Sequence, residues 1–253
     1  MDECLRVLDG KKKLDLFECA RVDPKTPIEI TIRALAKYVE AGKLGGISLS
    51  ECSADTIRRA AKVHKISAVE VEFSLWATDI LNNGVAQACK ELDIPVVAYS
   101  PLGRGFLVRP VSCYRGIQQL IAYKQTGQIK SFDDLPEGDF RRTSPRFQPD
   151  VFDKNMQLVR DIQKLAEKKG CTSGQLATGW VLAQNDKAEM PTIIPIPGAS
   201  SEDRVRENSV VVKLSKEEAA EIDGIIKEAV VIGGRYGGHA AALEYGSSPP
   251  LEE

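Results

Sequence analysis

Short runs of apolar and β-branched residues alternate along the chain with longer segments in which apolar positions recur every three or four residues. The short runs lie at residues 14–22, 46–50, 68–75, 95–100 and 192–196. Several of the longer segments begin at a side chain that can cap a helix, as Ser53, Thr172 and Ser215 can. Strands that alternate with helices of about 15 residues are typical of a parallel sheet, so the pattern predicts an α/β fold.

Glycine, proline and capping residues mark the ends of the predicted helices. Pro27 and Gly42 enclose one helix, and Thr26 with Glu29 predicts a capping box at its start. From residue 233 the composition turns to Gly, Ser and Pro, which predicts a mobile tail, so we divide the chain into a body (1–236) and a tail (237–253). Further helices are predicted at about 53–64, 83–92, a segment ending before Gly170, Thr172 through Trp180, 201–208 and 215–228.

Composition excludes several classes of partner. The 34 basic and 36 acidic residues give a net charge of -2, which leaves no excess to attract nucleic acid or an anionic membrane. The six cysteines form no C-x-x-C pair, which favours a reducing compartment. No run approaches the roughly 18 apolar residues of a membrane span, and residues 1–13 are too charged for a signal peptide. We therefore expect a soluble, cytoplasmic protein.

Four motifs occur in a defined order along the chain: LDLF followed by DPKTPIE within 14–29, EAGK to GISLS within 40–50, YSPLGRG at 99–105, and IPG to EN within 196–208. In this order they are similar to the aldo-keto reductases. The stretch FECARVD at 17–23 looks most like the pyridoxal reductases of that family, which reduce the vitamin B6 aldehyde with NADPH. The resemblance implies a (β/α)8 TIM barrel, of which this chain would carry strands four to eight and lack the N-terminal part.

The resemblance also implies a catalytic tetrad of Asp, Tyr, Lys and His. In such a tetrad Tyr protonates the carbonyl oxygen while the nicotinamide gives hydride to the carbonyl carbon. The first three positions would precede Met1, and the fourth would fall at Ala20, so we expect no catalytic residue of this set in the chain. We expect a small-molecule aldehyde as the family substrate, weak or no cofactor affinity, and no turnover by this chain alone.

The cofactor half of the family pattern is better represented. Tyr99 would stack on the nicotinamide, and Ser50, Glu51 and Glu70 would face its carboxamide, although the family usually has an amide at the last position. The expected pyrophosphate cradle comprises Ser100, Leu102, Gly103, Arg104 and Gly105. The expected adenosine-phosphate residues are Gly198, where a Lys is common, Ser200, Arg204, Glu207 and Asn208.

Each of these residues also has an ordinary structural explanation. A tyrosine on a strand usually packs in a core, and a glycine-rich loop is usually a turn. Arg204 and Glu207, three apart on a helix, would form a surface ion pair worth a few tenths of a kcal/mol. Only the joint order of the motifs favours a cofactor site, with no metal.

Residues 108–125 interrupt the expected sequence Gly-Phe-Leu-Thr-Gly, because Phe106-Leu107 would run directly into Thr126-Gly127. The segment keeps the reading frame. Its first residue, Val, is encoded GTN and is followed by Arg, its last residue, Gln, can be encoded CAG, and its Leu-Ile pair can be encoded CTA-ATH. An intron read through as protein would explain these codons together. We hypothesise a retained intron. The alternative is a real lid segment over the barrel mouth.

Three functions follow from these patterns. The first is an NADPH-dependent reductase of pyridoxal type, inactive as this chain, and the second is a non-catalytic NADPH-binding regulator of the same family. The third, a phosphosugar enzyme on a TIM barrel, explains the phosphate loops but not the ordered motifs. A barrel without its first strands would expose two edge strands and its apolar interior, which predicts marginal stability or aggregation unless a partner supplies them.

Overall fold

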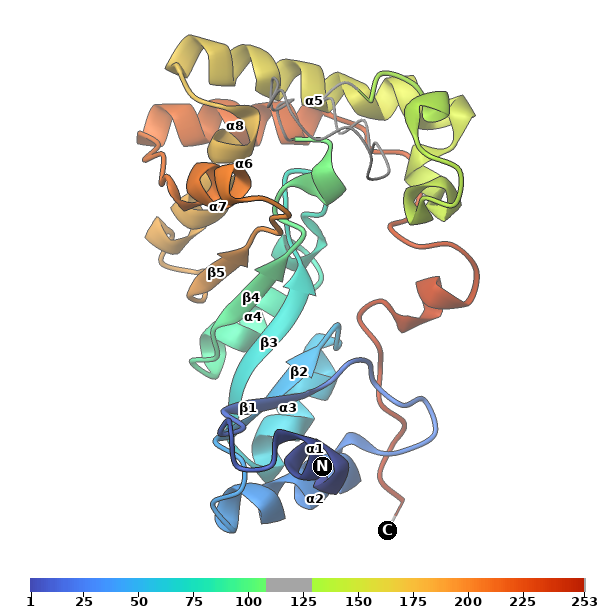
Figure 1. Cartoon of the computed structure of the whole chain (residues 1–253), viewed down its shortest axis with the longest axis vertical. Coiled ribbons are helices and arrows are strands. Elements are labelled where there is room, and N and C mark those ends of the chain that lie inside the picture. The colour runs from blue at the N-terminus through green and yellow to red at the C-terminus, as the bar shows by residue number, and fades with distance from the viewer. Residues whose placement is uncertain (108–128, 253) are drawn as a thin grey trace.

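The computed structural model describes residues 1–107 and 129–252, and its centre is a sheet of five parallel strands (Figure 1). The strands are β1 (Leu16–Cys19), β2 (Gly46–Ser50), β3 (Ile66–Glu72), β4 (Val96–Tyr99) and β5 (Ile193–Ile196). Each is hydrogen-bonded to the next one along the chain. This order confirms the predicted α/β fold with a parallel sheet, and all five predicted strands are present.

Helices connect the strands and complete the body. They are α1 (Asp2–Leu8), α2 (Ile28–Glu40), α3 (Ala54–Val63), α4 (Val85–Glu91), α5 (Pro149–Lys169), α6 (Ser173–Ala183), α7 (Glu202–Ser209) and α8 (Lys216–Glu228). All except α1 correspond to predicted helices. Short 3-10 turns lie between them: η1 (Asp79–Leu81), η2 (Gly103–Gly105), η3 (Phe132–Asp134), η4 (Phe140–Thr143), η5 (Pro145–Phe147), η6 (Gln184–Asp186) and η7 (Gly238–Leu243).

The predicted helix caps are confirmed at three sites and wrong at one. Ser53, Thr172 and Ser215 each accept a backbone N–H of the first turn, and the last two form complete capping boxes. Thr26 does not cap α2, which begins after Pro27 without a side-chain hydrogen bond. The reason is local, because the Thr26 hydroxyl donates to the Asp23 carboxylate (2.8 Å) in the preceding turn.

The main core lies between the sheet and its helices. Ile47 on β2, Val69 and Val71 on β3 and Val96 on β4 point to the same side of the sheet, and all four are fully buried. They pack in one cluster with apolar side chains of α2, α3, α4 and α6, among them Ile32. We call this helix-covered side the outer face of the sheet and the opposite side the inner face.

The segment 229–252 returns from α8 past the sheet to the neighbourhood of α2 (Figure 1). Gly246 pairs with Cys52 in an isolated parallel bridge. Ser248 is buried, and its hydroxyl accepts the first N–H of α2, that of Ile28, at 2.7 Å. The Arg59 guanidinium donates to the Ser248 carbonyl at 2.9 Å. The structure therefore differs from the mobile tail predicted for 237–253, since these residues satisfy polar groups of α2 and α3 that composition does not reveal.

Two expectations concern the edges and the interruption of the chain. β1 and β5 end the sheet as described, and Leu16, Ile194 and Ile196 on them are 47%, 47% and 44% exposed. These values agree with the expected exposure of two edge strands. The segment 108–125, expected to be an insertion or retained intron, lies outside the described residues and stays a prediction.

Candidate functional site

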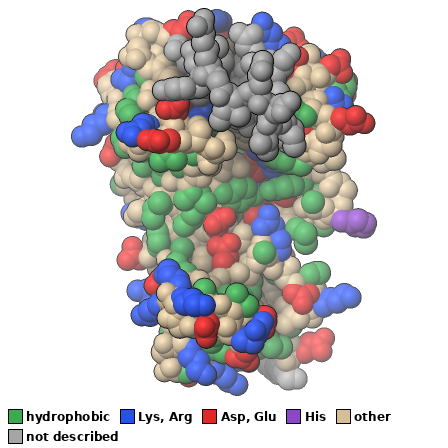
Figure 2. Space-filling model, viewed as in Figure 1, with side chains coloured by type: hydrophobic (Ala, Val, Ile, Leu, Met, Phe, Trp, Pro, Cys, Tyr) green, Lys and Arg blue, Asp and Glu red, His purple; other side chains and the backbone are tan. Residues whose placement is uncertain are grey.

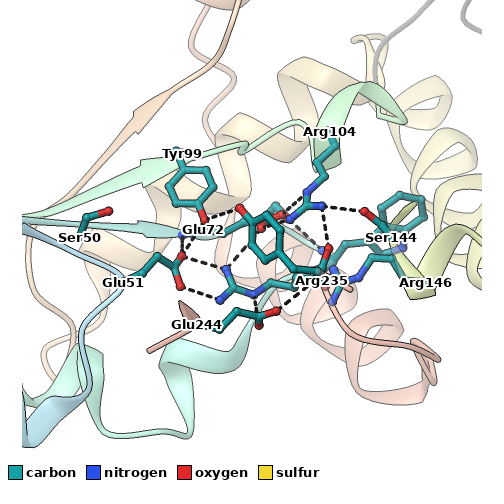
Figure 3. Close-up of polar contacts among 12 residues, drawn as sticks. Ser50, Glu51, Glu72, Tyr99, Arg104, Ser144, Arg146, Arg235 and Glu244 are labelled. Carbon is teal, nitrogen blue, oxygen red and sulfur yellow. Dashed lines mark hydrogen bonds and ion pairs between the residues drawn. The ribbon is translucent and has the colours of Figure 1, made fainter. Parts of the chain in front are cut away.

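Parallel strands bring their carboxyl ends to one edge of the sheet, where α/β proteins place their sites. Here Ser50 ends β2, Glu72 ends β3 and Tyr99 ends β4. The register pairs Ser50 with Glu70 and Glu72 with Tyr99, so these residues are neighbours across the sheet. Figure 3 shows Tyr99, Glu51 and Glu72 directed toward Arg235, which the C-terminal segment contributes.

Backbone strain is concentrated at this edge. Glu51, Ser100 and Arg104 have positive φ angles of 49°, 52° and 55°, which cost non-glycine residues roughly 1–3 kcal/mol each. Hydrogen bonds hold the first of them: the Glu51 N–H donates to the Glu70 carbonyl (2.9 Å), and its own carbonyl accepts the Gly246 N–H (2.6 Å). Such strain persists where the surroundings enforce it, and it is typical of functional sites.

A buried ion pair joins Glu51 to Arg235. The Arg235 Nη1 and Nη2 donate to Glu51 Oε1 and Oε2 at 2.9 and 2.7 Å, and both side chains are at most 2% exposed. Burial acts to raise the pKa of Glu51, but the hydrogen bonds and charge of Arg235 outweigh it and hold that pKa below its usual value. Glu51 is therefore ionised and bound on both oxygens.

A second buried pair lies beside the first. The Arg104 Nε and Nη2 donate to the Glu72 carboxylate at 3.1 and 2.6 Å. The remaining Arg104 nitrogen, Nη1, donates to Ser144 Oγ (3.1 Å) and to the Arg235 carbonyl (2.7 Å). Arg235 Nη1 also reaches Glu72 at 3.3 Å, so the two pairs form one network, which Glu244 extends by accepting from Arg235 Nε at 3.0 Å.

Tyr99 links this network to the inner face of the sheet. Its hydroxyl donates to Glu51 Oε1 at 2.7 Å, and the Tyr236 hydroxyl lies 3.0 Å from it. Burial, and next the negative charge of Glu51, raise the pKa of Tyr99 well above its ordinary range. Tyr99 therefore holds its proton tightly and is a poor general acid, which leaves its ring as the useful part for a ligand.

Half-buried carboxylates lie lower on the inner face. Ser48 Oγ donates to Glu18 Oε2 at 3.0 Å, and Arg21 Nη1 donates to Ser50 Oγ at 3.1 Å. Burial raises the pKa of Glu18, with a further contribution from the charge of Glu70. Burial also raises the pKa of Glu70, while the charge of Arg21 opposes the rise. The inner face thus carries acids that are easier to protonate than usual.

The comparisons with known proteins agree on one family. A model of the aldo/keto reductase family matches residues 1–227. The chain belongs to the aldo-keto reductase family. That match extends over nearly the whole chain and gives no support to the expectation that this sequence carries only strands four to eight of the barrel.

Curated aldo-keto reductases match almost the whole chain. An aldo-keto reductase of Schizosaccharomyces pombe, yakc, named for NADP(+), is 44% identical over 94% of this chain and 64% of its own length. Aldo-keto reductase str7 of Strobilurus tenacellus is 40% identical over 92% of the chain and 65% of its own length. A probable pyridoxal reductase 2 of S. pombe is 37% identical over 90% and 64%. The chain therefore spans somewhat less than two thirds of these relatives.

Solved structures share the fold. The glycerol dehydrogenase of Gluconobacter oxydans is 24% identical with a TM-score of 0.71, covering 91% of this chain and 63% of its own. A thermostable aldo-keto reductase solved with the inhibitor epalrestat is 22% identical with a TM-score of 0.60, covering 88% and 66%. At these identities the likeness shows the fold alone.

The residues expected to hold an aldo-keto reductase cofactor lie on or after strands of the sheet and on α7. Ser50, Glu70 and Tyr99 lie on neighbouring strands, and Gly198 follows β5, whose Ile196 pairs with Tyr99. Gly198 and Ser200 are exposed. The structure brings the nicotinamide group of expected residues together, while the adenosine group forms a separate surface at α7.

The loop expected to cradle pyrophosphate differs from that expectation. The Arg104 guanidinium donates to the Glu72 carboxylate, the Ser144 hydroxyl and the Arg235 carbonyl, so it is not available to a phosphate. The Gly103 and Gly105 N–H groups donate within the turn, to the carbonyls of Ser100 and Leu102. These donors are engaged because η2 is a tight turn above a buried carboxylate, which the motif alone does not reveal.

The α7 residues also have internal partners. Arg204 Nη1 donates to Glu207 Oε2 at 2.8 Å, and Asn208 Nδ2 donates to the Gly198 carbonyl at 3.2 Å. The helix begins at Ser201, whose hydroxyl accepts the Arg204 N–H. The predicted short helix is present. The Arg204–Glu207 pair is present too, but Arg204 is only 8% exposed, so the pair is largely buried and is not the surface pair that was expected.

We call the Glu51–Arg235 and Glu72–Arg104 pairs and their partners the strand-end network. Sequence reasoning missed its members Glu72, Ser144 and Glu244. A signal existed for Glu72, since an acid that alternates with valines on a buried strand needs a partner. No comparable signal marks Glu244, which lies 193 residues from Glu51 in a segment predicted as tail. Within the described residues no helix is long and apolar enough to cross a membrane.

Proposed function

We propose that this chain serves the NADPH-dependent reduction of an aldehyde, with the nicotinamide on Tyr99 and the adenosine 2′-phosphate at the start of α7. Family membership supports the proposal, and one relative is named for NADP(+). The observation that carries it is the convergence of Ser50, Glu70 and Tyr99 at one edge of the inner face. The probable pyridoxal reductase among the relatives supports pyridoxal as the substrate we propose to test first.

The side chains at both ends of the proposed site fit this cofactor. At the nicotinamide end, burial raises the pKa of Glu70, so its protonated form, which donates and accepts hydrogen bonds as an amide does, is easier to reach than in an ordinary glutamate. At the adenosine end, Gly198 has no atom within 4 Å of the place where a Cβ would stand, so a phosphate has room. We do not assign Arg104 to the pyrophosphate, because its guanidinium is ion-paired with Glu72.

NADPH, when bound, supplies hydride to the carbonyl carbon, and a proton must reach the carbonyl oxygen. Tyr99 is a poor donor of that proton because its pKa is raised. Neither histidine is placed to help: His64 follows α3 at the amino-terminal edge of β3, and His239 is exposed in η7. We therefore propose slow or no turnover by this chain, as Ala20 at the family His position also suggests.

The same observations favour a second candidate, a non-catalytic NADPH-binding protein. It shares the cofactor residues and needs no proton donor. Cofactor binding with no consumption of NADPH in the presence of pyridoxal would select this candidate. Consumption coupled to formation of the alcohol would select the reductase.

Titration of the full chain with NADPH, followed by the fluorescence of the reduced nicotinamide, tests the shared proposal. Tyr99→Leu removes the ring and should weaken binding roughly two- to tenfold, because ring stacking is worth about 0.5–1.5 kcal/mol. Tyr99→Phe keeps the ring and should bind nearly as the parent does. Tyr38→Leu on α2 is the matched control and should change nothing.

Two results would overturn the proposal. One is the absence of any NADPH signal from a chain whose circular dichroism shows it folded. The other is an equal loss of affinity in Tyr99→Leu and Tyr38→Leu, which would trace the effect to stability rather than to contact with the nicotinamide.

A further inference from the structure

A cavity of about 270 Å³ lies next to the strand-end network, whose Arg235 and Glu244 contribute to its lining. Its walls come from the loop after β3, from η5, from the end of α8 and from the segment that follows. The apolar part of the lining includes Leu75, Trp76, Ile226, Ala229 and Val231. Its charged members are Asp79, Arg146, Arg235 and Glu244.

Arg146 is the unusual member of this lining. It is 6% exposed, its Nη1 donates to the Trp76 carbonyl at 3.0 Å, and its Nε has no partner among the described residues. Arg104 and Arg235, by contrast, each hold carboxylates by two or more hydrogen bonds. A buried cation without a hydrogen-bonded anion is costly. The charges of Glu72 and Asp79 act on Arg146, but among the described residues no carboxylate is hydrogen-bonded to it.

A second donor of the same lining is also unsatisfied. Trp76 Nε1 is buried and has no hydrogen-bond partner within the described chain. Buried donors of this kind are rare, and an unpaired one calls for a missing acceptor. The two residues that carry these unsatisfied N–H groups, Arg146 and Trp76, both belong to the lining of the cavity.

The walls are held in place by specific contacts. Asn155 on α5 donates to the carbonyls of Arg146 (2.7 Å) and Ile232 (2.8 Å) and accepts the Ile232 N–H (2.8 Å). Gly233 has a φ of 93°, and a Cβ there would stand 2.7 Å from the Arg146 backbone N. The C-terminal segment can approach η5 this closely only with a glycine at that position.

Arg146 is the charged residue of the lining that we expect to contact a ligand, because the other charged residues are paired or exposed to water. Arg235 is bound by Glu51, Glu72 and Glu244. Glu244 in turn accepts from Arg235 and from the Tyr236 N–H. Asp79 is exposed, so water screens its charge.

We infer that this cavity binds a small organic carboxylate, whose oxygens accept from Arg146 and whose apolar part lies against Ile226, Ala229 and Val231. A carboxylate matches the planar guanidinium, and the aliphatic lining favours a ligand with a hydrocarbon part over inorganic phosphate or sulfate. The site is separate from the proposed cofactor site and does not depend on reductase activity.

The two tryptophans provide the test, because each has a resolvable indole N–H signal in a ¹⁵N–¹H NMR spectrum. Butyrate should shift the Trp76 signal saturably, with a Kd on the order of 1 mM. Trp180 serves as an internal control, since its Nε1 donates to Asp223 at 2.8 Å and should not respond. Arg146→Met should weaken butyrate binding roughly 10- to 100-fold, the worth of charge-assisted hydrogen bonds, while Arg160→Met on the exposed side of α5 should leave it unchanged.

A further variant keeps the test decisive if Arg146→Met does not fold. Asp79→Asn removes a negative charge from the lining and should tighten butyrate binding roughly twofold at low salt. An unshifted Trp76 signal in the presence of butyrate overturns the proposal. So does an equal response to sulfate and phosphate, or an equal response in Arg146→Met that remains folded.

Discussion

The two faces of the sheet are stabilised in different ways. The outer face is apolar throughout, and Ile47, Val69 and Val96 are fully buried against helices. The inner face carries the ion-pair network at its carboxyl edge and half-buried acids such as Glu18 and Glu70 below it. Figure 2 shows hydrophobic side chains across the middle of the molecule with acidic ones beside them.

The difference between the two faces suggests that the outer face specifies the fold, while the inner face positions the polar side chains of the candidate site. Apolar burial is non-directional and tolerates substitutions of similar volume, so the outer face can specify the fold without specifying a ligand. Buried ion pairs add little net stability, yet the loss of one partner leaves the other as an uncompensated buried charge, which is strongly destabilising. The inner face therefore holds side chains in fixed positions, and this costs free energy of folding because buried charges lose their hydration. The residues with strained backbone, Glu51 and Arg104, belong to the same network.

Removal of the Arg235 guanidinium should produce the largest effect. Arg235→Met leaves Glu51 and Glu72 buried without their shared cation and should lower the free energy of unfolding by about 3–5 kcal/mol. Urea denaturation followed by circular dichroism measures it, with the exposed Arg160→Met as the control. A loss below about 1 kcal/mol would show that the network is not formed and would remove the contrast between the two faces.

The outer and inner faces can be compared directly on β1 and β2. Ile47→Ala should cost about 2–5 kcal/mol, because it leaves a cavity in a fully buried core. Leu16→Ala removes a side chain that is half exposed and should cost less than about 1 kcal/mol. Equal losses in the same urea experiment would mean that the inner face is also packed in solution, for example by a partner on the edge strand.

Much of the outer face could be predicted from the sequence. The strand and helix positions follow from apolar periodicity, and caps such as Ser53 and Thr172 follow from local hydrogen bonding. Local signals fail where one side chain has two possible hydrogen-bond partners. The Thr26 hydroxyl, predicted to cap α2, donates instead to the Asp23 carboxylate. Periodicity also does not reveal α1, a short helix with no buried residue.

The inner face could be predicted only in part. Family motifs single out Ser50 and Tyr99 as candidate cofactor residues, a prediction that stays open, and the sheet register brings the two to one edge. The pairing of Glu51 with Arg235 spans 184 residues and depends on where the C-terminal segment returns, which no local pattern encodes. Composition suggested a mobile tail there, yet the segment supplies the buried Arg235 and Ser248.

The smallest expected effect concerns the acids of the inner face. Burial raises the pKa of Glu70 above its ordinary value of 4.5, with the charge of Arg21 opposing and that of Glu51 adding to the rise. The folded chain thus binds a proton more tightly than the unfolded chain, and stability falls as the pH rises from about 4.5 through the folded pKa. Glu70→Gln removes this loss.

The variant should therefore raise Tm relative to the parent at pH 7 and not at pH 4, by about 1 °C, since Glu70 is only half-buried and solvent screens part of its charge. Glu217→Gln on α8 is the matched control, because its carboxylate is exposed and hydrogen-bonded to Ser215, so that substitution should lower Tm slightly at pH 7 if it has any effect. In the NADPH titration, Glu70→Gln should bind at least as tightly as the parent at pH 8, where Glu70 is ionised and an amide is the better match for a carboxamide. Weaker binding with an unchanged melting profile would show that the inner face recognises its ligand through a carboxylate.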